Sequence, residues 1–272
     1  MAIDSYFLVG GKEYPRYVVS SFAQDDAICL TEDLARAIAD QIVRLRCKRN
    51  PKHYASWQIA AAGGAKPSAA VVSALRDFVT PGIGVPTKPP PPDHLEGCVA
   101  EHLWYFILQE TKDSSGLEHV EPPSLAPTDP GGDGLSIRRQ FDGELAFCLW
   151  EIKKRTGSGA VTQTINGAAV QLKARAESYL ARYTCTAEHT GRTDLEDLYA
   201  RLSEHWRNAS HQASAGISAS TSKSLARKRS FAGLPKHLSQ FTVPRRLFGQ
   251  LTTVADFSAF AREVQRIVWT GL

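Results

Sequence analysis

The spacing of apolar residues divides the chain into helical and extended segments. Apolar side chains recur every three or four residues in several stretches, as on one face of an amphipathic helix. Other stretches are short apolar runs bounded by turn residues, which is typical of strands. The pattern predicts helices over residues 32–46, 67–79, 93–109, 161–183, 194–205 and 257–272, and strands over residues 6–9, 14–20, 134–139 and 145–152.

Turn-rich segments separate these elements and indicate how the chain is organised. Residues 80–92, TPGIGVPTKPPPP, have the composition of a stiff polyproline II spacer. Gly10 and Gly11 predict a hairpin turn, residues 208–224 a mobile loop, and residues 48–54 a basic loop that either is solvated or contacts phosphate. We expect an N-terminal α+β lobe over residues 1–80, a proline-rich linker over 81–92, an α/β core over 93–190, and a basic, mainly helical extension over 191–272.

The composition is that of an ordinary globular protein, with 43% hydrophobic and 22% charged residues among 272. No apolar run reaches the roughly 20 residues of a membrane helix, and no secretory signal is visible at the N-terminus. The five cysteines are widely spaced and lack a C-x-x-C pair, which favours reduced thiols over a zinc or redox site. We therefore expect a cytoplasmic protein without a membrane partner.

Positive charge is concentrated toward the C-terminus. The formal net charge is only +4, yet residues 207–246 contain eight basic residues and no acidic residue. Such a concentration is typical of a surface that binds a polyanion, although a solvated tail has the same composition. The basic residues of this segment that we expect to contact nucleic acid are Arg227, Lys228, Arg229, Arg245 and Arg246.

Residues 131–154 are predicted to form a hairpin. Asp142-Gly143 suits a two-residue type I′ turn, because both central residues must adopt positive φ. If Phe141 pairs with Glu144 across this turn, Gly134 lies opposite Glu151. An acid just before Gly134 and an acid at the end of the second strand are then neighbours.

Asp133, Glu151 and Lys153 are the residues that this hairpin gathers. Two carboxylates can bind a hard divalent cation such as Mg²⁺, which polarises a phosphate and activates a bound water. A neighbouring lysine can orient that water or neutralise charge at the phosphorus. Asp142 is too far from Glu151 to share a metal, because it lies nine residues before Glu151, which corresponds to roughly 30 Å of strand. The competing interpretation is an ordinary cross-strand ion pair.

Asp133 followed by Glu151-Ile152-Lys153 resembles the D…(D/E)xK signature of the PD-(D/E)xK, or restriction-endonuclease-like, nucleases. The resemblance covers about residues 93–184, and Gly132 stands where the family usually has proline. It implies an α/β restriction-endonuclease-like core, a mixed sheet flanked by helices, between the N-terminal lobe and the C-terminal extension. It also implies that Asp133 and Glu151 bind Mg²⁺ or Mn²⁺ and that Lys153 assists the attack of water.

The resemblance suggests further site residues on the two flanking helices. A glutamate on the helix before the hairpin often reaches the metal in this family, and Glu101 best matches it, with Glu96 open as the alternative. Relatives often place a glutamine or lysine near the site on the helix after the hairpin. The residues expected beside the motif, as phosphate contacts or on that helix, are Lys154, Arg155, Gln171 and Gln163.

These features predict a Mg²⁺-dependent or Mn²⁺-dependent deoxyribonuclease, and the resemblance suggests an endonuclease of a prokaryotic restriction or phage-defence system. DNA is the expected partner. No P-loop motif G-x-x-x-x-G-K-[ST] occurs, so a helicase or ATPase partner would be a separate protein. A homo-oligomer is compatible with the sequence. The alternatives are a non-catalytic DNA-binding subunit of a larger nucleic-acid-processing complex, and a scaffold protein in which the E-x-K is incidental.

Overall fold

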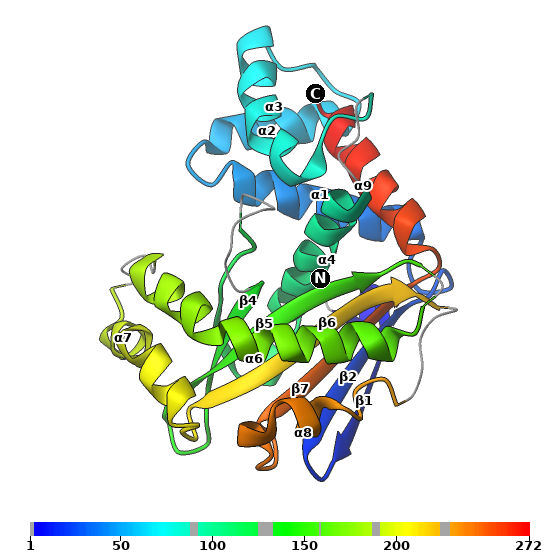
Figure 1. The fold of residues 1–272 in the computed structure, drawn as a ribbon. Helices are drawn as coiled ribbons and strands as arrows, with labels where there is room; N and C mark the ends of the chain where they lie inside the picture. The colour runs from blue at the N-terminus through cyan, green and yellow to red at the C-terminus, as the bar shows by residue number, and fades with distance from the viewer. Residues whose placement is uncertain (1–2, 88–91, 125–132, 158, 187–190, 224–228) are drawn as a thin grey trace.

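A seven-stranded mixed sheet forms the centre of the chain, and helices cover both of its faces (Figure 1). The computed structural model describes residues 3–87, 92–124, 133–157, 159–186, 191–223 and 229–272. The strand order is β1-β2-β7-β6-β5-β4-β3, in which β2, β7, β6 and β5 are parallel and the pairs at both edges are antiparallel. The predicted α/β class is confirmed. In chain order the strands are β1 (Phe7–Tyr14), β2 (Tyr17–Gln24), β3 (Leu117–Val120), β4 (Gly134–Arg139), β5 (Leu145–Arg155), β6 (Ala213–Ser222) and β7 (Leu247–Val254).

The helices that the apolar spacing predicts are present, each within a few residues of its expected bounds. Most of the predicted basic loop at residues 48–54 instead belongs to a further helix, which begins with proline at its first position. None of the helices in the described ranges is long and apolar enough to cross a membrane. In chain order the helices are η1 (Ile3–Ser5), α1 (Thr31–Arg46), α2 (Pro51–Ala61), α3 (Ala69–Ile83), α4 (Pro92–Glu110), α5 (Lys112–Ser115), α6 (Val161–Thr186), α7 (Thr193–Arg207), α8 (Leu234–His237), η3 (Ser239–Phe241) and α9 (Phe257–Thr270).

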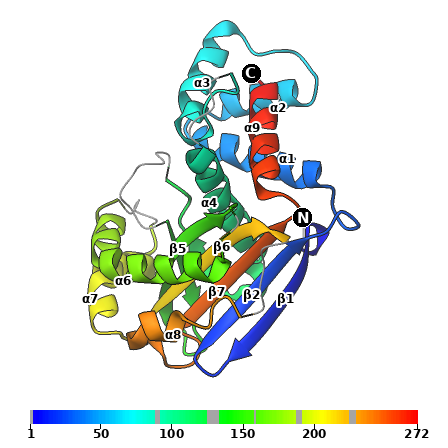
Figure 2. The ribbon, with the colours of Figure 1, turned by 45° about the vertical axis from the view of Figure 1, so that its right-hand side comes forward.

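The alternation of side chains along β5 divides the interior into two cores. Phe147 and Leu149 pack with α6 and α7, whereas Trp150 and Ile152 pack with α4 and α9. Figure 2 shows α6 lying across the sheet, while α4 runs from its far side toward the group of helices α1, α2, α3 and α9. The two cores therefore meet at β5, the strand that also carries the predicted site.

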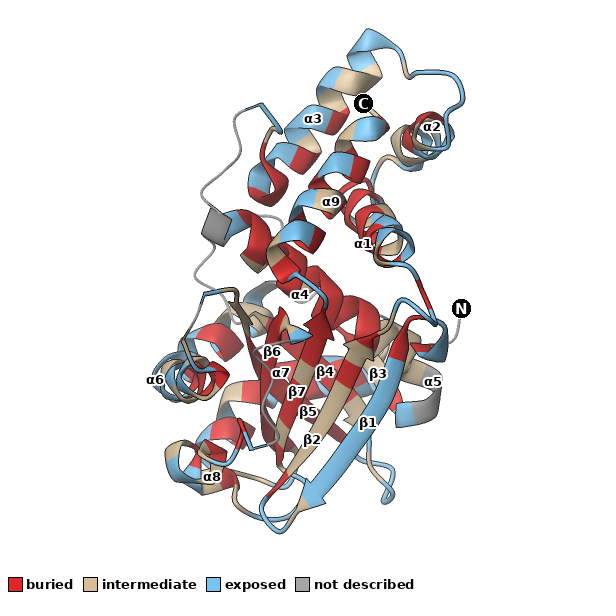
Figure 3. Cartoon of the chain, turned by 90° about the vertical axis from the view of Figure 1, so that its right-hand side faces the viewer, coloured by how far each residue is buried: buried red, intermediate tan, exposed pale blue. Residues whose placement is uncertain are grey.

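The predicted mobile loop at residues 208–224 is wrong, because residues 213–222 form the central strand β6 between β5 and β7. Nearly all of β6 is buried, as is most of β7, whereas the edge strand β1 is exposed (Figure 3). The C-terminal extension is consequently not mainly helical. Small residues such as Ala215, Ala219 and Ser218 can fill a strand that has a strand on each side and helices on both faces, since little room remains there.

The segments predicted as an N-terminal lobe and a C-terminal extension are interleaved in space. Strand β2 pairs with β7 in the common sheet, and α1 and α2 pack against α9. Two indole N–H groups donate to backbone carbonyls across this junction, Trp57 to Val268 and Trp269 to Gly84, both at 2.8 Å. Of the predicted linker, residues 81–83 belong to α3 and residue 92 begins α4, and residues 88–91 lie outside the described ranges.

The hairpin that carries the site is present, but its turn and register differ from the prediction. The N–H of Gly143 donates to the carbonyl of Gln140 (3.0 Å) and the N–H of Gln140 to that of Glu144 (2.8 Å), so the loop has three residues. Only one positive φ is needed, and Gly143 supplies it at 88°. The register shifts by one residue, with Gly134 opposite Trp150, and Asp133 still lies beside the end of β5.

The N-terminal hairpin turns at Pro15 and Arg16 rather than at the glycines, since Tyr14 pairs with Tyr17. Gly10 lies inside β1 opposite Ser21, whose hydroxyl oxygen would be 2.8 Å from a Cβ at position 10. Glycine at this position therefore permits a close approach between strands instead of a turn.

Gly216 of β6 makes room for the indole of Trp150, and this contact yields a stability prediction. A Cβ at position 216 would lie 2.4 Å from the Trp150 ring, which is held by a hydrogen bond to Ser136 (2.9 Å). We expect Gly216→Ala to lower the free energy of unfolding by about 2–3 kcal/mol, measured by urea denaturation. Gly167→Ala on the exposed face of α6, where no atom lies within 4 Å, is the control. Equal stability of the two variants would contradict the prediction.

Candidate active site

Asp133, Glu151 and Lys153 meet where β4 begins and β5 nears its end. Asp133 Oδ2 accepts a hydrogen bond from the backbone N–H of Ile152 (2.7 Å), which fixes the acid against β5. Lys153 Nζ lies 2.6 Å from Glu151 Oε1 and 3.5 Å from Asp133 Oδ2. The structure therefore brings together the three residues of the D…ExK pattern.

The carboxylate of Glu151 is fully buried, with 0% exposure. Lys153 Nζ lies 2.6 Å from Oε1 and pairs with this carboxylate, and no other described residue donates a hydrogen bond to either oxygen. Burial, together with the negative charge of Asp133, raises the pKa of Glu151 to about 7. A buried carboxylate without hydrogen bonds is costly unless a cation accompanies it, which is the property expected of a metal ligand.

Asp133 and Lys153 complete the charge balance of this group. Burial raises the pKa of Asp133, although the Lys153 charge and the Ile152 N–H both favour the ionised form. Burial would lower the pKa of Lys153, but the charges of Asp133 and Glu151 outweigh it and raise that pKa. Lys153 is thus an ammonium ion, and it neutralises one of two adjacent negative charges.

Glu101 of α4, the predicted assisting acid, interacts electrostatically with the group. Burial raises its pKa to about 8, the charges of Asp133 and Glu151 add to this, and Lys153 and Arg46 oppose it. Arg46, at the end of α1, is buried and hydrogen-bonded to Cys98, one helical turn before Glu101. No local sequence pattern marks Arg46 as a site residue, because only helix packing brings α1 to α4.

Glu121, just after β3, is a further, partly buried acid that sequence reasoning missed. It accepts a hydrogen bond from the Tyr199 hydroxyl, and His119 Nε2 lies 3.3 Å from its Oε1. Burial alone would raise the pKa of Glu121, but the hydrogen bonds from His119 and Tyr199 hold it below its usual value. The charges of Glu121, Asp133 and Glu101 all raise the pKa of Tyr183, after burial as the first cause.

Lys154, predicted to contact phosphate, instead pairs with Glu96, the alternative assisting acid. The Nζ–Oε2 distance is 2.5 Å, and the side chains are 18% and 7% exposed. Glu96 also accepts hydrogen bonds from Thr156 (3.1 Å) and from Ser258 of α9 (2.6 Å). This cluster connects β5, α4 and α9. The contacts of Glu96 are with this cluster and not with Asp133, Glu151 or Lys153.

The pairing predicts that Lys154 stabilises the fold rather than binding substrate. We expect Lys154→Met to lower the free energy of unfolding by about 3 kcal/mol, because it leaves Glu96 buried with only hydroxyl donors. DNA binding per folded molecule should match that of Lys173→Met, an exposed lysine change on α6. Thermal denaturation and filter binding measure the two effects. Weaker DNA binding at unchanged stability would restore the phosphate-contact interpretation.

Two other predicted nucleic-acid contacts lie near the site in sequence and make local hydrogen bonds. The guanidinium of Arg155 donates to the carbonyl of Gly159 (3.2 Å). Gln171 on α6 donates to the Tyr179 hydroxyl (3.4 Å). Gln163, also on α6, is exposed. Neither Arg155 nor Gln171 makes a contact with Asp133 or Glu151 among those described.

Two residues of the predicted basic segment, Arg245 and Arg246, lie away from the site. Arg245 pairs with Glu13 of β1 (3.2 Å), and Arg246 donates to the carbonyls of Ala213 (2.9 Å) and Ala209 (2.8 Å) before β6. These contacts lie at the starting ends of β6 and β7, whereas Lys153 lies beside Ala219, near the end of β6. Arg229 is exposed. Arg227 and Lys228 lie outside the described residues.

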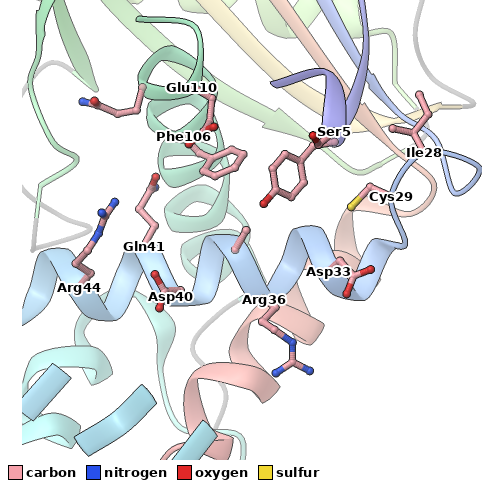
Figure 4. A pocket seen from close by; sticks show the side chains of 13 residues that line it. Ser5, Ile28, Cys29, Asp33, Arg36, Asp40, Gln41, Arg44, Phe106 and Glu110 are labelled. Atoms are coloured by element: carbon pink, nitrogen blue, oxygen red, sulfur yellow. The ribbon is translucent and has the colours of Figure 1, made fainter. Parts of the chain in front are cut away.

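A pocket of about 680 Å³ lies elsewhere, between α1, the C-terminal end of α4 and η1. Its lining includes Phe106 and Gln41, while Arg36 at its rim points away (Figure 4). None of the predicted site residues lines it. Within the described ranges, no three His, Cys, Asp or Glu side chains form a ready-made metal site, so the acids would need to move toward a bound cation.

Fold and site together define an α/β protein in which an antiparallel hairpin groups a fully buried glutamate with a partly buried aspartate and lysine. No protein-family model matches the chain, and no curated protein matches it. Its function is therefore inferred from the geometry of the site.

Proposed function

We propose that the chain is a divalent-metal-dependent nuclease that hydrolyses phosphodiester bonds in DNA. The observation that carries this proposal is the fully buried Glu151 carboxylate, which lies beside Asp133 with Lys153 Nζ 2.6 Å from its Oε1. Oxygen atoms of this kind suit Mg²⁺ or Mn²⁺. Glu151 and Asp133 would hold the metal, and Glu101 on α4 would assist them.

The order of elements around the site supports a restriction-endonuclease-like core. Helix α4 precedes the β4–β5 hairpin, and α6 follows it and packs on β5 and β6. The acids come from the start of β4 and the end of β5, and a further acid comes from α4. This is the arrangement that the resemblance of residues 93–184 implies.

The residues present can perform the protein's part of this chemistry. When bound, a metal ion supplies an activated water and polarises the phosphate. Asp133 is oriented by the Ile152 N–H, so its free oxygen can point toward the cation. The Lys153 ammonium, now between two carboxylates, can turn toward a substrate phosphate once a cation neutralises those acids. There it would stabilise the negative charge that develops in the transition state.

The second candidate function is a non-catalytic DNA-binding subunit. It is favoured by the absence, in the described ranges, of a ready-made cluster of three metal ligands. It is also compatible with Lys153 acting only as a structural counter-ion for Asp133 and Glu151. The two candidates differ in whether divalent metal produces cleavage.

The test is an assay of supercoiled plasmid and linear DNA with Mg²⁺, with Mn²⁺ and with EDTA. We expect metal-dependent nicking by the native chain and by Glu144→Gln, an exposed change on the same hairpin. Glu151→Gln should not cleave. Cleavage that persists in Glu151→Gln would assign the activity to another site or to a contaminant. No cleavage with any metal, together with salt-sensitive DNA binding, would replace the nuclease with the binding subunit.

A further inference from the structure

A second pocket, of about 350 Å³, opens behind the β4–β5 hairpin, between the sheet and the C-terminal end of α4. Trp150 of β5 and Arg138 of β4 line it, and both belong to the sheet face that packs toward α4. None of Asp133, Glu151 and Lys153 lines this pocket. Its volume lies within the usual range for small-molecule sites, about 300–1,000 Å³.

Arg138 gives this pocket a positive charge that no carboxylate of the described residues neutralises. Its guanidinium carbon lies 4.6 Å from the centroid of the Phe248 ring, a cation–π contact. No carboxylate in the described ranges pairs with Arg138, in contrast to its neighbour Arg139, which binds Glu118 and Asp194. A half-buried guanidinium held against an aromatic ring attracts an anion more strongly than an exposed one, because solvent screens it less.

The other residues that line the pocket indicate which further chemical groups a ligand would have. Trp150, Val9, Val18 and Leu117 are apolar, and the Phe248 ring lies 6.4 Å from the Trp150 ring. Ser20 and the buried Gln250 add groups that can form hydrogen bonds. Aromatic and aliphatic walls favour a flat apolar body, and the guanidinium favours a carboxylate or a phosphate at one end.

We infer that this pocket binds a small organic anion, in which a flat apolar body packs against Trp150 and Phe248 and an anionic group pairs with Arg138. The anion would provide the counter-charge that Arg138 lacks among the described residues. Because Trp150 directly precedes Glu151 in β5, an occupied pocket would contact the strand that carries the predicted site. The inference does not depend on the proposed nuclease activity.

Isothermal titration calorimetry tests binding with four probes: 1-naphthyl phosphate, 1-naphthoate, the neutral 1-naphthamide and inorganic phosphate. We expect one-site binding of at least one naphthyl anion at submillimolar concentration, and the comparison of the two anions distinguishes phosphate from carboxylate. The neutral amide and inorganic phosphate should bind at least about 10-fold more weakly. The amide has no anionic group to pair with Arg138, and inorganic phosphate has no apolar body to pack against the aromatic rings.

Two variants and a matched control locate the site. Arg138→Met should weaken the preferred anion about 10-fold or more, whereas Arg76→Met, at an arginine that lies over Trp269 outside the pocket, should not. Val9→Trp on the exposed edge strand should block the pocket and leave Arg138 in place, so it serves if Arg138→Met fails to fold. No saturable binding at millimolar concentration, equal binding of the neutral amide, or unchanged binding in Val9→Trp would overturn the inference.

Discussion

Glu151→Gln is expected to abolish cleavage and, without divalent metal, to stabilise the folded chain at pH 8. Glutamine removes a fully buried negative charge. The same change removes an oxygen that the proposed metal requires, so cleavage should fall by at least about 1,000-fold. Opposite effects on stability and activity are typical of a residue that is kept for function.

The sign of the stability change follows from the raised pKa of Glu151. Burial, with the charge of Asp133, raises this pKa to about 7 in the folded chain from an ordinary value of 4.5. The folded state therefore holds the proton more tightly than the unfolded state, and this contribution is complete below about pH 4.5 and is lost as the pH rises through 7. At pH 8 we expect Glu151→Gln to raise the free energy of unfolding by about 2 kcal/mol.

Urea denaturation from pH 5 to pH 8 in EDTA measures this effect. The native chain should lose stability across this range, and Glu151→Gln should lose less. The control is Glu144→Gln, in the exposed turn of the same hairpin. Adding Mg²⁺ at pH 8 should stabilise the native chain but not Glu151→Gln, because only a bound ligand shifts the folding equilibrium. A stability curve of Glu151→Gln parallel to that of the native chain would contradict the prediction.

Lys153→Met is expected to destabilise the folded chain, in contrast to Glu151→Gln. Like Glu151→Gln, it is expected to abolish cleavage. Without the ammonium, the fully buried Glu151 and the partly buried Asp133 become two adjacent carboxylates with no cation between them. At pH 8 we expect the free energy of unfolding to fall by about 3–5 kcal/mol, as when one partner of a buried ion pair is removed. The loss should be smaller at pH 5, because burial raises both acid pKa values and the acids take up protons more readily.

Thermal unfolding at pH 5 and pH 8, with and without Mg²⁺, tests this second prediction. Mg²⁺ should recover part of the stability lost in Lys153→Met, because a divalent cation can replace the missing charge. Lys173→Met, an exposed change on α6, is the control for removal of a lysine. A loss of stability equal at both pH values, or unaffected by Mg²⁺, would mean that Lys153 contributes packing rather than charge. Cleavage equal to that of the native chain would remove Lys153 from the proposed mechanism.

The sequence by itself determined the elements whose signals are local. Apolar spacing predicts helices α1, α3, α4, α6, α7 and α9, and the turn residues Asp142-Gly143 predict the β4–β5 hairpin. The proximity of Asp133 and Glu151 was also predicted. It holds in the structure although the predicted pairing of β4 with β5 was wrong by one residue. A hairpin places the two strand ends together whichever turn type connects them, so the grouping depends little on the detail of the loop.

Only the tertiary structure decided the roles that depend on distant partners. Residues 213–222 have no strand signal, because alanine and serine gain burial only between β5 and β7. Lys154 and Arg245 looked like phosphate ligands, yet Glu96 and Glu13 pair with them from other elements. Arg46 reaches Glu101 only through the packing of α1 on α4. Periodicity records which face of an element is apolar, whereas the charge that a side chain meets depends on contacts between segments far apart in the chain.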